Sequence, residues 1–399
     1  MAPLGEQLGR LRRIAQLTQE QLSERADVSI DVIKKLEQGR KQSARLPTLH
    51  ALAAGLGVEL TALLGEPPAV SDKPADPPQL VAVRRAISPP MFGMPPEPSA
   101  PELSLSGLRS DIADAWTLYH AARFDPLMTR LPRLINDTRF AATVGRENQQ
   151  ADGQALLSKA LQLGGHLAIR LGKTDLALSA LERSMAAAEK SSDPLLAGMI
   201  STSVAWSYQR QARLDDARTL AVFAADRVER DHTDTADGLR VWGGLLMSAA
   251  TSCARGGDYD RANEMMTQAE NAAGRLAKLP PTTNGKLVSV FSRSSVRIER
   301  VRLAVQHKRP REALELAKGM RLSKDVPPSW RTWLLLDIAR AHTDLGDAGS
   351  AVRALERLNR TAPDWVRHHT LAVTIVQDLW AGPDRPPGLR RLAELLGVD

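Results

Sequence analysis

Residues 18–39, T-Q-E-Q-L-S-E-R-A-D-V-S-I-D-V-I-K-K-L-E-Q-G, constrain the fold of this 399-residue chain more than any other segment. Thr18 and Gln21 match a capping box, in which the hydroxyl and the side-chain amide each satisfy a free backbone donor at a helix start. After a turn, Ser29 is a residue type that caps helices, and the glycine at the end of the stretch favours a helix stop. The sequence therefore predicts two short helices joined by a tight turn.

The apolar residues of this stretch recur at helical spacing. In the second helix Ile33 and Leu36 lie three apart and share an inward face with Val28. A helix whose outer face bears two lysines suits the major groove of a DNA duplex. The residues predicted on that outer face are Ile30, Asp31, Lys34 and Lys35.

Amphipathic segments surround this pair of helices. Residues 4–14 predict a first helix, Thr48 is a candidate cap for a fourth helix that runs through Leu56, and residues 59–64 predict a short fifth helix. Five helices of this length can close one small core. Residues 1–66 are therefore predicted to form a domain.

The whole segment resembles the Cro and lambda-repressor (XRE) class of helix-turn-helix domains. Its match to the pattern L-T-Q-x-x-L-x-x-x-x-x-V-S-x-x-x-I-x-x-L-E-x-G runs from Leu17 to Gly39. The resemblance implies a five-helix domain that binds double-stranded DNA. It also implies an internal ion pair between Arg12 and Glu37.

The same resemblance implies a set of DNA-contacting residues. Gln19 corresponds to a glutamine that anchors a backbone phosphate at a helix amino terminus. The outer face of the second helix corresponds to residues that face base edges, and the basic residues after it correspond to phosphate contacts. The implied contacts are Gln19, Ser29, Ile30, Asp31, Lys34, Lys35, Arg40, Lys41 and Arg45.

The second helix also departs from the family that it resembles. Ile30, Asp31 and Val32 stand where small polar residues or arginine are common in that family. An outward isoleucine can pack only on an apolar group such as a thymine methyl. Asp31 can accept a hydrogen bond from cytosine but repels phosphate, so we expect a weakened or an unusual operator preference. Positive charge is local, since residues 34–45 hold five basic residues and one acidic residue, whereas residues 1–66 hold nine and eight.

A proline-rich stretch follows this domain. Residues 67–101 contain eleven of the chain's 25 prolines. Because proline lacks a backbone donor and fixes φ, the stretch cannot be one continuous helix, and we expect a semi-extended linker over residues 67–106. Within it, three apolar residues at helical spacing predict a short docking helix over residues 79–87.

From about Leu108 to Leu379 a unit of two amphipathic helices recurs, with a short polar turn and then an alanine near the start of the second helix. Two antiparallel helices cross closely after such a turn, and a larger side chain would push them apart. The intervals of 40, 45, 51 and 38 residues exceed the roughly 34 of a tetratricopeptide unit, which the pattern otherwise resembles. The alanines are Ala177, Ala217, Ala262, Ala313 and Ala351, with Leu127 in an earlier unit.

Residues 107–399 are therefore predicted to form about six helix pairs stacked as an α-solenoid, with an irregular helical bundle as the alternative. The concave face of a solenoid commonly binds peptides or partner helices. We expect this domain to form a homodimer, to bind a peptide or a small acidic ligand, or to do both. Arg293, Arg297 and Arg300 share one face of a predicted helix and are the candidate ligand contacts, with a solvated face as the alternative.

Composition favours an all-α protein, because aromatic content is only 4%. One cysteine, Cys253, excludes an intrachain disulfide, and the sequence has neither a signal-peptide pattern nor an apolar run of membrane-spanning length. No histidine spacing or glycine-rich loop marks a metal, cofactor or catalytic site. We expect a cytoplasmic protein that is not an enzyme, uses no cofactor or metal and does not enter a membrane.

Two functions fit these features. The first is a sequence-specific transcriptional regulator whose helical repeats sense a ligand or peptide, dimerise, or both. The second is a protein interaction scaffold, in which the repeats hold a partner and the amino-terminal domain is a secondary contact. Reversing the charge of Lys34 and Lys35 separates the two, because only the regulator would lose its binding to DNA.

Overall fold

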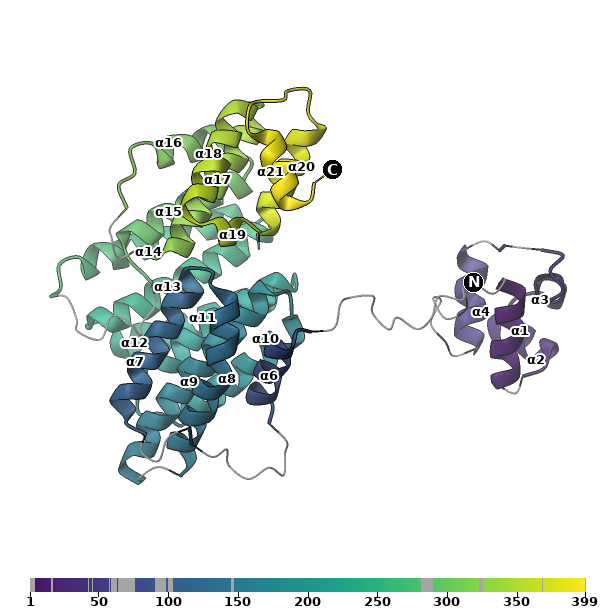
Figure 1. Cartoon of the computed structure of the whole chain (residues 1–399), viewed down its shortest axis with the longest axis horizontal. Coiled ribbons are helices and arrows are strands. Elements are labelled where there is room, and N and C mark those ends of the chain that lie inside the picture. Colours follow the sequence, from purple (N-terminus) through teal and green to yellow (C-terminus); the bar gives the residue numbers. More distant parts are fainter. Residues whose placement is uncertain are drawn as a thin grey trace. The chain divides into compact units, whose positions relative to one another are not determined.

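The computed structural model shows only helices in the residues that it describes (Figure 1). The chain divides into two compact units, Met1–Asp76 and Pro77–Asp399. The helices of both units confirm the prediction of an all-α protein. The described residues are 4–15, 17–41, 43–44, 46–56, 58, 63, 76–89, 98–99, 103–144, 147–280, 290–322, 326–367 and 369–398.

The first unit contains four helices in its described part, and they close a small apolar core. The predicted fifth helix over residues 59–64 lies outside the described residues except for Leu63, which is buried. The largest fully buried side chains of this core are Leu8, Leu22, Ile33, Leu36, Leu52 and Leu63. The helices are α1 (Leu4–Ile14), α2 (Gln19–Ala26), α3 (Ile30–Glu37) and α4 (Leu46–Leu56).

Two glycines let these helices approach closely. A Cβ atom on Gly5 of α1 would lie 1.9 Å from the carbonyl oxygen of Leu36 in α3, so only glycine fits at this crossing. A Cβ atom on Gly55 of α4 would lie 2.8 Å from the Cβ of Ala26 in α2. The fourth helix starts at Leu46 and not after Thr48, so the predicted cap at Thr48 is wrong. The proline at position 47 is tolerated in the first turn of a helix, which explains the earlier start.

In its described residues the second unit contains six helix pairs, preceded by one helix and followed by three. The first helices of the pairs are α7 (Leu105–His120), α9 (Glu147–Arg170), α11 (Leu196–Arg210), α13 (Ala236–Arg255), α15 (Arg293–Gln306) and α17 (Pro328–Asp344). The second helices are α8 (Phe124–Thr143), α10 (Thr174–Glu189), α12 (Leu214–His232), α14 (Tyr259–Leu276), α16 (Pro310–Ala317) and α18 (Ala348–Thr361). The remaining helices are α6 (Pro78–Ile87), α19 (Pro363–Arg367), α20 (Thr370–Ala381) and α21 (Leu389–Leu396).

The predicted alanines occupy one structural position. Each is the fourth residue of a second helix, and each is completely buried where that helix crosses its partner. Leu127 has the same position in α8 and is also completely buried. The prediction of paired helices with a small residue after the turn is therefore confirmed. The alanines are Ala177 (α10), Ala217 (α12), Ala262 (α14), Ala313 (α16) and Ala351 (α18).

Each turn between paired helices contains one residue in the left-handed conformation, two positions before the second helix begins. Three of the six turns use glycine there, which adopts positive φ without strain. The other three carry a Cβ atom, which raises the cost of this conformation by roughly 1 kcal/mol. The six residues are Ala122 (φ 58°), Gly172 (70°), Ala212 (59°), Gly257 (85°), Lys308 (55°) and Gly346 (77°).

Replacing Ala212 or Lys308 by glycine should therefore stabilise the second unit by about 0.5–1 kcal/mol each. Both side chains are exposed, so the change leaves no cavity. Urea unfolding followed by tryptophan fluorescence measures the effect on this unit alone, because all seven tryptophans lie in it. The matched control is G172A, which should destabilise the unit by a similar amount although a Cβ there meets nothing within 4 Å. Unchanged stability in all three variants would contradict this account of the turns.

The docking helix predicted over residues 79–87 is present as α6. Its buried residues Leu80, Val83 and Ile87 pack into the core of the second unit, and it contacts α8, α9 and α10. Arg139 of α8 donates a hydrogen bond to the carbonyl oxygen of Ala86 over 2.7 Å, which satisfies an acceptor at the end of α6. The boundaries of the linker over residues 67–106 stay a prediction.

Helices α17 and α19 of the second unit contact its first pair. The indole N–H of Trp365 in α19 donates to the carbonyl oxygen of His120 at the end of α7 over 2.9 Å. The Nδ1 atom of His120 lies 2.9 Å from the hydroxyl of Ser329 in α17. The Trp365 ring also packs edge-on against Phe124, with 5.8 Å between ring centroids. Helices more than 200 residues apart in sequence are therefore joined.

Candidate nucleic-acid interface

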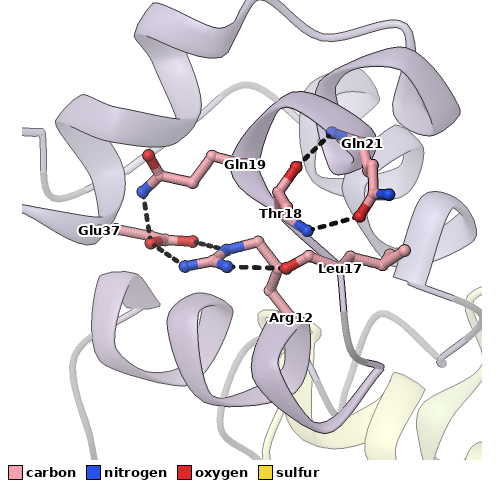
Figure 2. Close-up of polar contacts among 6 residues, drawn as sticks. All are labelled: Arg12, Leu17, Thr18, Gln19, Gln21 and Glu37. Atoms are coloured by element: carbon pink, nitrogen blue, oxygen red, sulfur yellow. Dashed lines mark hydrogen bonds and ion pairs between the residues drawn. The ribbon is translucent and has the colours of Figure 1, made fainter.

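Helices α2 and α3 and the turn between them form the predicted helix-turn-helix. The capping box is present, since the amide of Gln21 donates to the Thr18 hydroxyl and the amide of Thr18 donates to the Gln21 side chain (Figure 2). At the other end of α2, Asp27 adopts the left-handed conformation with φ 48°, and the Ser23 hydroxyl donates to the carbonyl oxygen of Val28. These contacts fix the direction in which α3 leaves the turn.

Ser29 precedes α3 as predicted, but its side chain makes no capping hydrogen bond. The predicted side-chain cap is therefore wrong. The backbone instead starts the helix alone, with the amides of Val32 and Ile33 donating to the carbonyl oxygen of Ser29. The Ser29 side chain is exposed at the amino terminus of α3 and remains available for an external contact.

An ion pair joins α1 to α3, as the resemblance implied. The guanidinium of Arg12 donates to both carboxylate oxygens of Glu37, over 2.8 and 2.9 Å, and also to the carbonyl oxygen of Leu17 over 2.8 Å (Figure 2). Gln19 at the start of α2 donates its side-chain amide to Glu37 over 2.7 Å. One carboxylate thus connects three helices.

Burial and hydrogen bonding act in opposite directions on this carboxylate. Burial opposes ionisation of Glu37, but the hydrogen bonds from Arg12 and Gln19 outweigh it and keep the pKa of Glu37 below its ordinary value. The bond to Glu37 likewise raises the pKa of Arg12. Both side chains are at most 15% exposed, and removal of one partner from such a pair typically costs about 3 kcal/mol.

The contact between Gln19 and Glu37 was missed by sequence reasoning, which assigned Gln19 only to a phosphate. Its side-chain nitrogen is already bound to Glu37. This bond positions the side chain at the amino terminus of α2, where free backbone amides favour an anion. A role for Gln19 at a DNA phosphate therefore stays a prediction.

The predicted outer face of α3 is exposed or half-buried. Asp31 and Lys35 are exposed, and Ile30 and Lys34 are half-buried. Val32 differs from expectation, because its partly buried side chain packs against the domain core and is not free for an outside contact. The face therefore presents two basic residues, one acidic residue and one apolar residue.

Two of the three predicted phosphate contacts after α3 lie on the surface. Gly39 has φ 68° and turns the chain away from the end of α3, and Arg40 and Lys41 follow it with exposed side chains. Arg45 lies outside the described residues. The exposed Glu20 at the start of α2 has a lowered pKa because of hydrogen bonds to its own backbone amide and to Thr18, with a smaller contribution from the charge of Lys34.

The predicted ligand stripe lies on α15, but its three arginines do not act alike. Arg300 is held by α14, since its guanidinium donates to Glu270 over 2.7 Å and also contacts Asn263 and Thr267. Arg293 and Arg297 are exposed. The structure thus gives Arg300 a contact between neighbouring helices, and a ligand at Arg293, Arg297 and Arg300 stays a prediction.

Within the described residues, no three side chains of the metal-binding types gather closely enough to hold an ion. Cys253 is buried, and burial raises the pKa of its thiol. None of the described helices combines the length and the apolar character that crossing a bilayer demands.

Comparison with known proteins adds three likenesses. Residues 3–64 match the model of a family described as a helix-turn-helix domain. An immunity repressor protein of Bacillus phage phi105 is 32% identical over 73 residues, which are 18% of this chain and 50% of the phage protein, so the chain spans about half of that relative. The crystal structure of Bacillus thuringiensis PlcR in complex with the peptide PapR7 and DNA aligns with 79% of this chain and 94% of that chain, at 13% identity and a TM-score of 0.36.

Proposed function

We propose that this chain, whose amino-terminal domain belongs to the helix-turn-helix family, is a sequence-specific DNA-binding regulator of transcription. A helix-turn-helix domain is a DNA-binding module and not a catalytic one, which agrees with the prediction that the chain is not an enzyme. The observation that carries the proposal is the exposed face of α3, held in a fixed orientation by the contacts of Glu37 with Arg12 and Gln19.

The proposed docking follows from this geometry. Helix α3 enters the major groove, where Lys34 and Lys35 reach base edges or phosphates and Asp31 accepts from a cytosine amino group. Ser29 and Ile30 lie at the leading end of the helix, and Ile30 packs on a thymine methyl. Arg40, Lys41 and Arg45 neutralise phosphates beside the groove, which adds affinity without sequence preference.

The helical repeats supply control in this proposal. They sense a peptide or a small acidic ligand, form a homodimer, or do both, and the protein acts in the cytoplasm. A dimer would place two copies of α3 on half-sites roughly 34–36 Å apart, which is one turn of DNA. The proposed operator is therefore a repeated or palindromic sequence.

Selection from sheared genomic DNA by the purified full-length protein tests the proposal. The bound fragments should share one sequence, and affinity should fall roughly 100-fold between 50 and 200 mM salt if four phosphates are contacted. Capture of fragments without a common sequence, or the absence of any salt-sensitive binding, would exclude the regulator and leave the interaction scaffold.

A further inference from the structure

Three successive first helices of the second unit end on an arginine. Arg170 is the last residue of α9, Arg210 of α11 and Arg255 of α13. Each lies seven residues before one of the buried alanines, so the three occupy one register of the repeat. We call Arg170, Arg210 and Arg255 the arginine row. Equivalent residues of stacked helix pairs lie side by side, so the row forms a continuous basic strip.

Each of Arg210 and Arg255 is influenced by the charge of another member of the arginine row, and no described residue gives either of them a negative partner. Arg210 and Arg255 have exposed side chains, and neither guanidinium has a hydrogen bond or ion pair with any residue in the described part of the chain. Loss of hydration lowers the pKa of Arg210, and the charge of Arg170 lowers it further. The pKa of Arg255 is lowered in the same way, with Arg210 as the neighbour. Neighbouring like charges disfavour each other's charged form, and a bound anion would relieve this repulsion.

Arg170 is held at one end of the row by aromatic rings. Its guanidinium carbon lies 5.0 Å from the ring centroids of Trp206 and Trp333 and 4.6 Å from that of Trp365. Its Nε atom donates to the Tyr119 hydroxyl over 3.3 Å. Aromatic faces stabilise a cation without neutralising it. Arg170 is therefore fixed in place and keeps its positive charge.

The surroundings of Arg170 contain polar atoms that lack partners. The indole N–H of Trp333, which can only donate, is buried and makes no hydrogen bond with a described residue. The Nδ1 atom of His369 is also buried and unpartnered. Burial and the charges of Arg170, Arg302 and Arg210 lower the pKa of His369 to about 3, so this ring is neutral. Buried donors without acceptors are rare in folded proteins and point to a missing group.

Nearby carboxylates are already occupied. The guanidinium carbon of Arg302 lies 4.2 Å from the ring centroid of Trp333, and this guanidinium pairs with Glu299 over 3.0 Å and with Asp337 over 3.4 Å. These two carboxylates therefore neutralise Arg302 and do not pair with the arginine row. The site near Arg170, Arg210 and Arg255 combines fixed positive charge, open access at two arginines and an unused donor.

We propose that the arginine row binds a small polyanion, a molecule with two or more phosphate or carboxylate groups, as the effector of this protein. Guanidinium groups bind both kinds of oxyanion through paired hydrogen bonds, and three positive charges on successive helices call for more than one anionic group. The indole N–H of Trp333 supplies a further donor at the inner end. This inference rests on the effector-sensing role proposed above, and it places the effector on α9, α11 and α13 and not on α15.

Calorimetric titration of the full-length protein with sodium tripolyphosphate and with citrate, in the absence of DNA, tests this site. The two probes distinguish a phosphate ligand from a carboxylate ligand. At least one should bind the wild-type protein, and the R210Q/R255Q variant should bind it at least tenfold more weakly, since both changed residues lie on the surface. Without the probe, that variant should melt at the same temperature as the wild type or higher, because a repulsion has been removed.

Two control variants make the result specific. R227Q/R261Q removes the same charge from exposed positions of α12 and α14, and its affinity should stay within twofold of the wild type. K34E/K35E should also retain wild-type affinity for the probe. The inference is overturned if neither probe binds the wild type, if R210Q/R255Q binds as tightly as the wild type, or if K34E/K35E abolishes binding, which would mean that the probe mimics DNA. Failure of DNA binding alone would leave these titrations unchanged.

Discussion

The K34E/K35E variant should lose at least 100-fold in operator affinity while its amino-terminal domain stays folded. Each change removes an attraction to the duplex and adds a repulsion, and the two lysines lie on the outer side of α3. Neither lysine belongs to the core of the domain, which consists of apolar residues and the pair between Arg12 and Glu37. The loss should therefore come from the interface and not from unfolding.

A fluorescence anisotropy titration with a labelled operator fragment, repeated at several salt concentrations, measures this loss. The matched control is R10E/R25E, which reverses two exposed charges elsewhere in the same domain and should weaken binding only a few-fold. The slope of log affinity against log salt should become shallower for K34E/K35E and stay similar for the control. Equal losses in both variants would show that only the total charge matters, and would remove the assigned role of α3.

The second unit should lose stability steeply as the pH falls from 6.5 towards 4. Burial first, and the charge of Arg170 second, lower the pKa of His120 to about 4 and that of His166 to about 3. His369 has a pKa of about 3 for similar reasons. In the unfolded chain each ring titrates near 6.5, so below that pH the unfolded state binds protons that the folded state excludes. Stability contributed by the three neutral rings is complete above pH 6.5 and is lost on acidification.

One buried acid acts in the opposite direction. Burial raises the pKa of Asp337 to about 6, so the folded state gains a proton there before the unfolded state does. Near pH 5, unfolding lets the three histidines take up a proton each and makes Asp337 release its proton. The net uptake on unfolding is therefore about two protons. The free energy of unfolding should then fall by about 3 kcal/mol per pH unit.

Urea unfolding curves between pH 7 and pH 4.5, followed by tryptophan fluorescence, measure this slope. His166, whose Nε2 atom lies 2.8 Å from the Ser203 hydroxyl, is the residue to change. H166N should reduce the slope by about 1.4 kcal/mol per pH unit, which corresponds to one proton. The control H232N changes a histidine at the end of α12, away from this cluster, and should keep the wild-type slope. A stability that is flat over this range would refute the assignment of three neutral rings.

The fold could be predicted from sequence wherever local signals and burial agree. The capping box at Thr18 and Gln21 and the alanines after each turn have direct physical causes in a few adjacent residues, and the structure confirms them. Ser29 and Thr48 are also capping residue types, but neither caps a helix through its side chain as predicted. A proline at position 47 is tolerated in the first turn of α4, so this helix starts before Thr48. At the start of α3 the amides of Val32 and Ile33 donate to the carbonyl oxygen of Ser29 and not to its side chain.

The shared register of the arginine row, seven residues before each alanine, can be read from the sequence. The surroundings of the row cannot, because the rings of Trp333 and Trp365 that contact Arg170 lie more than 150 residues away in the chain. The predicted stripe on α15 came from spacing within one helix, which shows a shared face but not what the neighbouring helix supplies. Glu270 of α14 supplies a partner for Arg300, and sequence spacing carries no information about that contact.

The hydrogen bond between Trp365 and His120 bears on how this protein can evolve and unfold. An open stack of repeats tolerates gain or loss of a unit at its end, and it can fray from either end because each unit touches only its neighbours. Here α17 and α19 meet the first pair, so an inserted unit would pull them apart. This contact is therefore expected to restrict the number of helix pairs. The second unit is also expected to melt in one cooperative transition.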